Sequence, residues 1–128
     1  MAVRIVRLGS PRARGEGLRI GTVRRPPRGV PKDQHAAQNW YDVWLPELSP
    51  SPELVKTARA SSSERAWVAF ARRYRAAIAV PDKAHILGLL AALSHRTDFS
   101  VGCYCEAERR CHRALLRALL EEHGAELA

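Results

Sequence analysis

Residues 81–93 read as a helix that is apolar around nearly its whole circumference. Its large apolar residues do not fall on one stripe: they are Ile86, Leu87, Leu89, Leu90 and Leu93. A helix of this kind is expected to be buried on most sides. A strand over 99–104 follows within a few residues and places Phe99, Val101 and Cys103 on one face. A buried helix that alternates with strands favours a mainly parallel sheet covered by helices.

Two further strands are predicted near the beginning of the chain, over 2–8 and 18–23, where apolar residues alternate with polar ones. Strands and helices in this order predict a single three-layer α/β domain over residues 1–128, with a small, mainly parallel sheet and helices packed on it. Sheets of this type bind ligands at the carboxyl ends of their strands.

Helix start signals divide the second half of the chain. Ser51 before a proline is a typical N-cap, and Ser61-Ser62-Ser63-Glu64 fits a capping box that opens the next helix. The helix after Ser63 has one apolar face, formed by Trp67, Phe70, Ala71, Tyr74 and Ile78. A last helix is expected from about Cys111 to a glycine C-cap at Gly124.

The composition is that of a globular protein, with 46% apolar residues in 128. No apolar run is long enough to cross a bilayer, so we expect no membrane partner. The first residues lack the apolar core of an export signal, and three cysteines, an odd number, suit a reducing compartment. These features predict a cytoplasmic protein.

The chain is strongly basic, with 21 Lys and Arg against 13 Asp and Glu and a formal net charge of +8. Only three of the cations are lysines. Such a balance favours anionic partners, which include small phosphorylated or carboxylated molecules and nucleic acid.

All three cysteines fall in one short segment, Cys103-Tyr104-Cys105-Glu106 followed by Cys111-His112-Arg113. The segment links the predicted strand to the last helix. One interpretation is a metal site, since three sulfurs and an imidazole suit tetrahedral zinc; the ligands would be Cys103, Cys105, Cys111 and His112. Neighbouring residues diverge by about 100° on a regular helix, so Cys111 and His112 can share one ion only if the helix begins after Cys111.

A second interpretation is a reactive thiol. Cys105 or Cys111 would be the nucleophile, with His112 as the base and Glu106 or Glu108 as the orienting acid. Cys103 and Arg109 also have the spacing of a phosphatase signature, but the residues between them include two acids and no glycine. A third interpretation is that Cys103 is a small core residue and that Cys105 and Cys111 are half-buried, unreactive thiols.

A second concentrated signal is the loop with Arg24, Arg25, Arg28 and Lys32, which is stiffened by three prolines. Arginine offers a planar fork for phosphate or carboxylate, so the loop could hold an anion, or it could be a solvated basic loop. Aromatic residues follow it and could stack bases or anchor the loop to the core; they are Trp40, Tyr41 and Trp44. No helix-turn-helix, zinc-finger or RNA-recognition signature is present.

Many short motifs occur in the order seen in a known bacterial family. They are Arg19-Ile20, Arg24, Pro27-Arg28-Gly29-Val30, Lys32, Trp44, Ser49-Pro50-Ser51, Glu53-Leu54, Phe70, Tyr74, Cys105-Glu106 and Cys111-His112-Arg113. Over about residues 18–120 the chain resembles the family called domain of unknown function 488, in its YeaO-like, Cys-His-Arg form. The family usually has an acid and a tryptophan where this chain has Val23 and Pro26. The resemblance implies an α/β fold and a site at the matched residues, and it names no reaction.

Together these patterns predict a pocket between the Arg24–Lys32 loop and the Cys103–Arg113 segment. We expect an anionic ligand to be bound by Arg24, Arg28, Lys32 and Arg113. A thiolate at Cys105 or Cys111 would supply reactivity. The alternatives are a non-catalytic zinc-binding module and a nucleic-acid-binding accessory protein.

Overall fold

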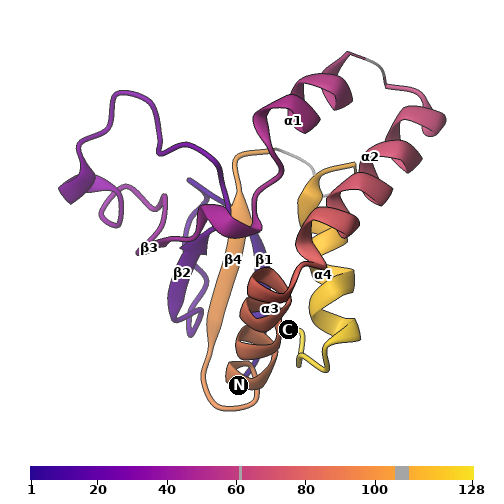
Figure 1. The fold of residues 1–128 in the computed structure, drawn as a ribbon. Helices are drawn as coiled ribbons and strands as arrows, with labels where there is room; N and C mark the ends of the chain where they lie inside the picture. The colour runs from indigo at the N-terminus through magenta and orange to yellow at the C-terminus, as the bar shows by residue number, and fades with distance from the viewer. Residues whose placement is uncertain (61, 106–109) are drawn as a thin grey trace.

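Four short strands form a parallel sheet in the order β1-β4-β2-β3 (Figure 1). The strands are β1 (Val3–Arg7), β2 (Leu18–Gly21), β3 (Val43–Trp44) and β4 (Phe99–Cys103). The computed structural model describes residues 1–60, 62–105 and 110–128. Because β4 pairs with both β1 and β2, its carboxyl end lies between theirs.

Four helices complete the fold: α1 (Pro52–Arg59), α2 (Glu64–Ile78), α3 (Pro81–Leu93) and α4 (His112–Glu122). The Ser51 hydroxyl accepts a hydrogen bond from the amide of Leu54, and Ser63 caps α2 in the same way. After α4, Gly124 adopts a left-handed conformation with φ of 88°, which ends the helix. The predicted strands, helices and α/β class are therefore confirmed, with the Ser51 cap and the Gly124 stop. The predicted capping box needs correction, because the cap of α2 is Ser63, which directly precedes Glu64.

The main core lies between one face of the sheet and the helices. Val3, Ile20 and Val101 point to this side from neighbouring strands. Helical residues from all four helices pack against them, including Leu54, Phe70, Tyr74, Leu87, Leu90, Leu116 and Leu120. This apolar burial fixes the helices above the sheet and holds α4 beside α2 and α3.

The opposite face of the sheet carries loops in place of helices. Arg19 and Ser100 point to this side and contact Glu16 in the loop between β1 and β2. The ring of Tyr41 lies so close to Gly21 that a β-carbon there would collide with it. The domain thus has three layers, and loop segments make the third.

Two expectations about the elements need correction. The apolar helix α3 is buried on one side only: Leu87 and Leu90 are covered, but Leu89 is 59% and Leu93 39% exposed. The reason is that α3 packs against the core and α4, while its outer side carries no other element (Figure 1). Strand β3 was not expected, since two residues are too few to show an alternation.

No helix in the described ranges is by itself long and apolar enough to span a membrane. Helices α2 and α3 reach the required length and composition only as a pair, and they are bent by 90° at their junction.

Candidate functional site

The carboxyl ends of β2 and β4 meet the beginning of α4 at one edge of the sheet. Strand β4 ends at Cys103, and β2 ends at Gly21, just before Thr22 and Val23. In a second buried cluster, Cys103 and Cys111 pack with Val23, together with Leu8 and Tyr41. Segments distant in the sequence therefore converge at the sheet edge where parallel sheets bind ligands.

Two sulfurs and one imidazole form a tight group there. The Sγ atoms of Cys103 and Cys111 are 2.9 Å apart, and Cys111 Sγ lies 3.8 Å from Nδ1 of His112. One ligand atom from each of the three residues lies within 4.8 Å of the others, and all three residues are buried. Cys111 has φ of −116° and ψ of 152°, so α4 begins after it. This is the condition under which Cys111 and His112 can face one ion.

The orientation of His112 is set by its other ring nitrogen. Nε2 lies 2.9 Å from the backbone oxygen of Thr22, which can only accept a hydrogen bond, so Nε2 carries the proton. Burial is the main cause that lowers the His112 pKa to about 4, so the ring is neutral near pH 7. A neutral ring protonated at Nε2 presents the Nδ1 lone pair to Cys111, where it can bind a metal or accept a proton.

Cys105 differs from the other two thiols because it is exposed. Hydrogen bonding to Cys103 and Cys111 lowers the pKa of Cys105, and the charge of Arg113 acts in the same direction. Hydrogen bonds with Cys105 and Cys111, together with burial, raise the Cys103 pKa. For Cys111, the hydrogen bond with Cys103 lowers the pKa, but that with Cys105 and burial outweigh it. Among the three thiols, only that of Cys105 has a lowered pKa.

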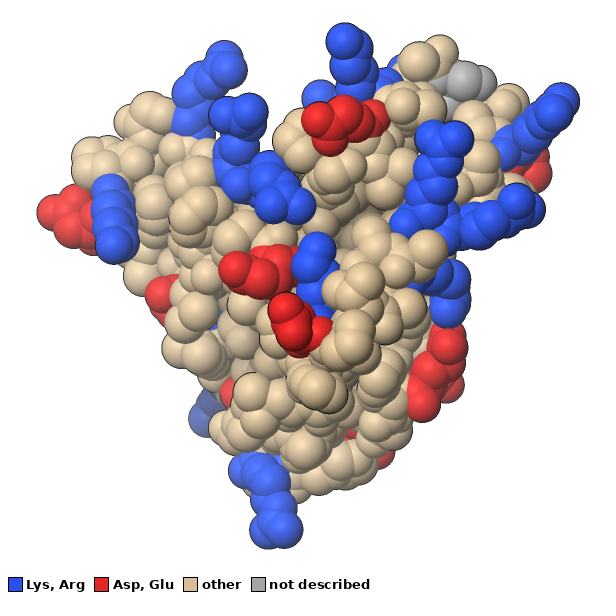
Figure 2. Space-filling view, viewed as in Figure 1, with Lys and Arg blue, Asp and Glu red and all other residues tan. Residues whose placement is uncertain are grey.

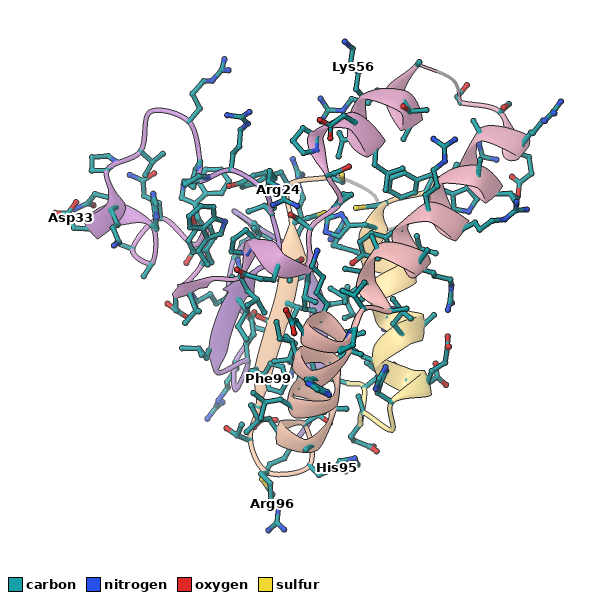
Figure 3. All side chains as sticks on the ribbon, viewed as in Figure 1. Arg24, Asp33, Lys56, His95, Arg96 and Phe99 are labelled. Carbon is teal, nitrogen blue, oxygen red and sulfur yellow. The ribbon has the colours of Figure 1, made fainter. Side chains whose placement is uncertain are left out.

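A cleft of about 460 Å³ opens beside the sulfurs. Cys103, Cys105 and His112 line one side of the cleft. Its other lining residues are largely apolar, among them Val23, Pro50, Pro52 and Val55, and four basic side chains join them: Arg24, Arg25, Lys56 and Arg59. No carboxylate occurs among its described lining residues. Figure 2 shows Lys and Arg side chains gathered over the upper half of this face. In Figure 3, Arg24 lies at the upper end of β4 and Phe99 at the opposite end.

Hydrogen bonds hold the arginine loop against the cysteine segment. The Tyr104 hydroxyl donates to the backbone oxygen of Arg25 at 2.8 Å. On the other side of the cleft, a guanidinium nitrogen of Arg24 lies 3.4 Å from the backbone oxygen of Ser49. The predicted juxtaposition of the two segments is thus present in the structure.

The predicted ligand-binding residues occupy different places. Arg24 lines the cleft with the thiols, whereas Arg28 lines an adjoining cleft and Lys32 a third. Arg113 is only 3% exposed and donates a hydrogen bond of 2.7 Å to the backbone oxygen of Cys105. Arg113 therefore holds the backbone at Cys105 by a hydrogen bond from the buried side. Direct contact between Arg113 and a ligand stays a prediction.

The predicted catalytic and metal-binding residues are only partly close together. Cys103, Cys111 and His112 form the compact group, whereas the regular strand ends before Cys105, which is exposed at the cleft. Glu106, with Glu108 and Arg109, lies outside the described residues. The orienting acid and the phosphatase spacing therefore stay untested.

Two basic residues of the cleft were missed from the sequence. Lys56 and Arg59 stand three apart on α1, which places both on one side of that helix. Basic residues in the last turn of a helix also have an ordinary explanation, because they interact favourably with its dipole. Only the packing of α1 beside the strand ends identifies them as part of the cleft.

Comparison with known proteins gives one match. The model of the family DUF488-N3a, described as the active DUF488-N3 subclade, matches residues 3–124. No curated protein and no solved structure matches the chain.

Proposed function

The chain belongs to the DUF488 family, in its DUF488-N3 subclade, and from that premise we propose that the cleft binds a small phosphorylated or carboxylated molecule beside a reactive thiolate. In this proposal Arg24, Arg25 and Arg59 hold the anionic group. Cys105 supplies the nucleophile, and the thiols of Cys103 and Cys111 stabilise it by hydrogen bonding.

The observation that carries the proposal is the charge of the cleft. Four cationic side chains line it, and its described lining contains no acid. Arginine guanidinium groups bind phosphate and carboxylate by paired hydrogen bonds, more strongly in a partly enclosed site than in open solvent. A solvated basic loop alone would not place Arg24 from the loop and Arg59 from α1 around one cavity that also contains thiols.

The thiol arrangement supports reactivity at Cys105 in particular. A thiolate is the reactive form of cysteine, and it needs both a favourable environment and access. Cys105 has both, whereas Cys103 and Cys111 are buried. In this proposal the buried thiols of Cys103 and Cys111 stabilise the Cys105 thiolate and do not themselves react with the ligand.

The proposal is tested by calorimetric titration with inorganic phosphate and with citrate. Replacing both Arg25 and Arg59 with alanine is expected to weaken binding at least about tenfold, since each hydrogen bond to a charged group contributes about 1.5 kcal/mol or more. Arg73→Ala is the matched control because Arg73 is exposed on α2 and lines none of the three clefts. No binding to the wild type, or equal loss in both variants, would refute the anion site.

A second candidate function is a zinc-binding module, and the geometry of Cys103, Cys111 and His112 favours it. His112 donates from Nε2 to a backbone oxygen, as histidines that bind metals through the other nitrogen commonly do. Cys105 would be the fourth ligand. Nucleic-acid binding has only the net charge of +8 in its favour.

Elemental analysis of protein purified without a histidine tag separates the two candidates. Stoichiometric zinc that is lost in Cys105→Ser would favour the module. Metal-free protein in which iodoacetamide modifies Cys105 near pH 6 would favour the reactive thiol.

A further inference from the structure

A larger cleft of about 890 Å³ adjoins the thiol cleft. The loop after β1 forms one wall, and the turn at Pro26 and Pro27 forms the other. The rings of Trp40 and Tyr104 lie at its base, edge to face, with centroids 5.8 Å apart and planes at 77°. Nothing in the proposed thiol chemistry uses this space.

The walls of this cleft combine stiff apolar residues with arginines. Trp40 packs against Gly9 so closely that a β-carbon there would collide with the indole ring. Pro11, Pro26 and Pro27 line the sides, and proline restricts backbone movement. A rigid cleft with prolines and aromatic rings fits a flat ring better than a flexible chain or a sugar. A planar ring can lie against an aromatic side chain over its whole face and so exclude water from that surface.

The two clefts are continuous. Both are lined by Arg25, Arg59 and Tyr104, so the arginines stand where the clefts join. Arg7 and Arg28 add positive charge to the larger cleft, whose described lining again contains no carboxylate. In a ligand that occupies both clefts, the negatively charged group would lie at Arg25 and Arg59. The rest of the ligand would extend into the larger cleft on one side, and the thiols would lie on the other.

We propose that the ligand is a mononucleotide, with its base in the larger cleft against Trp40 and its phosphate between Arg25 and Arg59. This inference rests on the proposed anion site and assigns the class of molecule that the site takes. A nucleotide joins a planar ring to a phosphate across a short sugar, which is the order of surfaces that the joined clefts present. Arg28 lies beside the base.

The test compares ligands on the unmodified protein by calorimetry. Adenosine, guanosine, cytidine and uridine monophosphates are titrated beside ribose 5-phosphate, which has the phosphate without a base. At least one nucleotide is expected to bind about tenfold more tightly than ribose 5-phosphate, since stacking of a base on an aromatic side chain has an effect of that size. Equal affinities would overturn the nucleotide inference and leave the anion site intact.

Two pairs of variants locate the base. Trp40→Leu is expected to remove the advantage of the nucleotide and to leave binding of ribose 5-phosphate unchanged. Trp44→Leu is its control, because Trp44 is partly exposed on β3 and lines neither of the joined clefts. Should Trp40→Leu not fold, Arg28→Ala against Lys32→Ala makes the same comparison with exposed side chains.

The remaining outcomes are also decisive. Failure of phosphate, ribose 5-phosphate and nucleotides alike to bind would overturn the anion site and this inference together. A single-stranded oligonucleotide that binds far more tightly than any mononucleotide, with a steep dependence on salt, would replace the mononucleotide with nucleic acid. Loss of nucleotide binding in Trp44→Leu but not in Trp40→Leu would place the base elsewhere.

Discussion

Two groups of buried polar residues in the described part of the chain differ in whether their hydrogen bonds are complete. On the loop-covered face of the sheet, Arg19 pairs with Glu16 at 2.7 Å and also donates to the backbone oxygens of Ser10 and Asn39. Ser100 donates to the same carboxylate. Every polar group in this network has a partner, so it stabilises the fold and leaves no group for a ligand.

The group at the carboxyl edge of the sheet is open by comparison. In the described residues, the hydrogen bond recorded at Nδ1 of His112 is a long one to the sulfur of Cys111, 3.8 Å away. The Nε atom of Arg113 is buried without a partner in the described part of the chain. Cys105 is exposed at the cleft, and its pKa is lowered. A buried polar group without a partner costs stability, so the complete network stabilises the fold more than the group at the carboxyl edge does.

The largest expected effect is the removal of one partner from the complete network. Arg19→Met leaves the Glu16 carboxylate buried without its cation, and such losses cost about 3–5 kcal/mol. Urea denaturation followed by circular dichroism measures the change. Arg75→Met is the control, because the Arg75–Glu122 pair is exposed and should cost under about 1 kcal/mol. Equal effects in the two variants would contradict the assignment of Arg19 as structural.

Acid should weaken the same network by a slightly smaller amount. Burial raises the Glu16 pKa, but hydrogen bonds from Arg19 and Ser100 outweigh it and lower the pKa from 4.5 to about 2. In the folded state Glu16 therefore becomes protonated at a lower pH than in the unfolded state. The contribution of Glu16 is complete above pH 4.5 and is lost as the pH falls toward 2, by on the order of 3 kcal/mol.

Denaturation between pH 5 and about pH 2 tests this dependence. Glu16→Gln is expected to be less stable at pH 7 and to lose less stability on acidification. The paired carboxylate of Asp42 also has a lowered pKa and titrates in both proteins, so the difference between the two curves isolates Glu16. Parallel curves would contradict the lowered pKa.

Arg113 gives the smallest expected change in stability and a distinct change in reactivity. Its described contacts comprise one hydrogen bond to the oxygen of Cys105 and no carboxylate, so Arg113→Met should cost about 1 kcal/mol or less. The charge of Arg113 lowers the pKa of Cys105, so the variant should need a higher pH for alkylation. A stability loss as large as that of Arg19→Met, with unchanged alkylation, would make Arg113 purely structural.

Much of the fold could be predicted from the sequence because the signals are local. Serine caps, the glycine that ends α4 and the alternation in β1 and β4 are set by neighbouring residues. The exposure of Leu89 and Leu93 could not be predicted, since it depends on which side of α3 meets the rest of the chain. The role of Arg19 was missed although Glu16 is only three residues away, because Ser100 joins this pair only when β2 pairs with β4.

The location of the site could be predicted from the sequence, but the exposure of each thiol and the full set of basic residues around it could not. The cysteine segment and the arginine loop both follow strands of a parallel sheet, and this order alone brings them to one edge. The sequence does not indicate which thiol is exposed, because that depends on where β4 ends and where α4 begins. It also gives no sign that Arg59 from α1 joins the cleft.

Thiol mapping by mass spectrometry after brief iodoacetamide treatment at pH 6 most directly tests the contrast between the two regions. We expect Cys105 to be modified first, Cys103 and Cys111 to remain unmodified in the folded protein, and inorganic phosphate to slow the reaction at Cys105. Modification of Cys103 or Cys111 as fast as Cys105, or a rate at Cys105 that phosphate does not change, would contradict the account of an open thiolate site beside an anion-binding cleft.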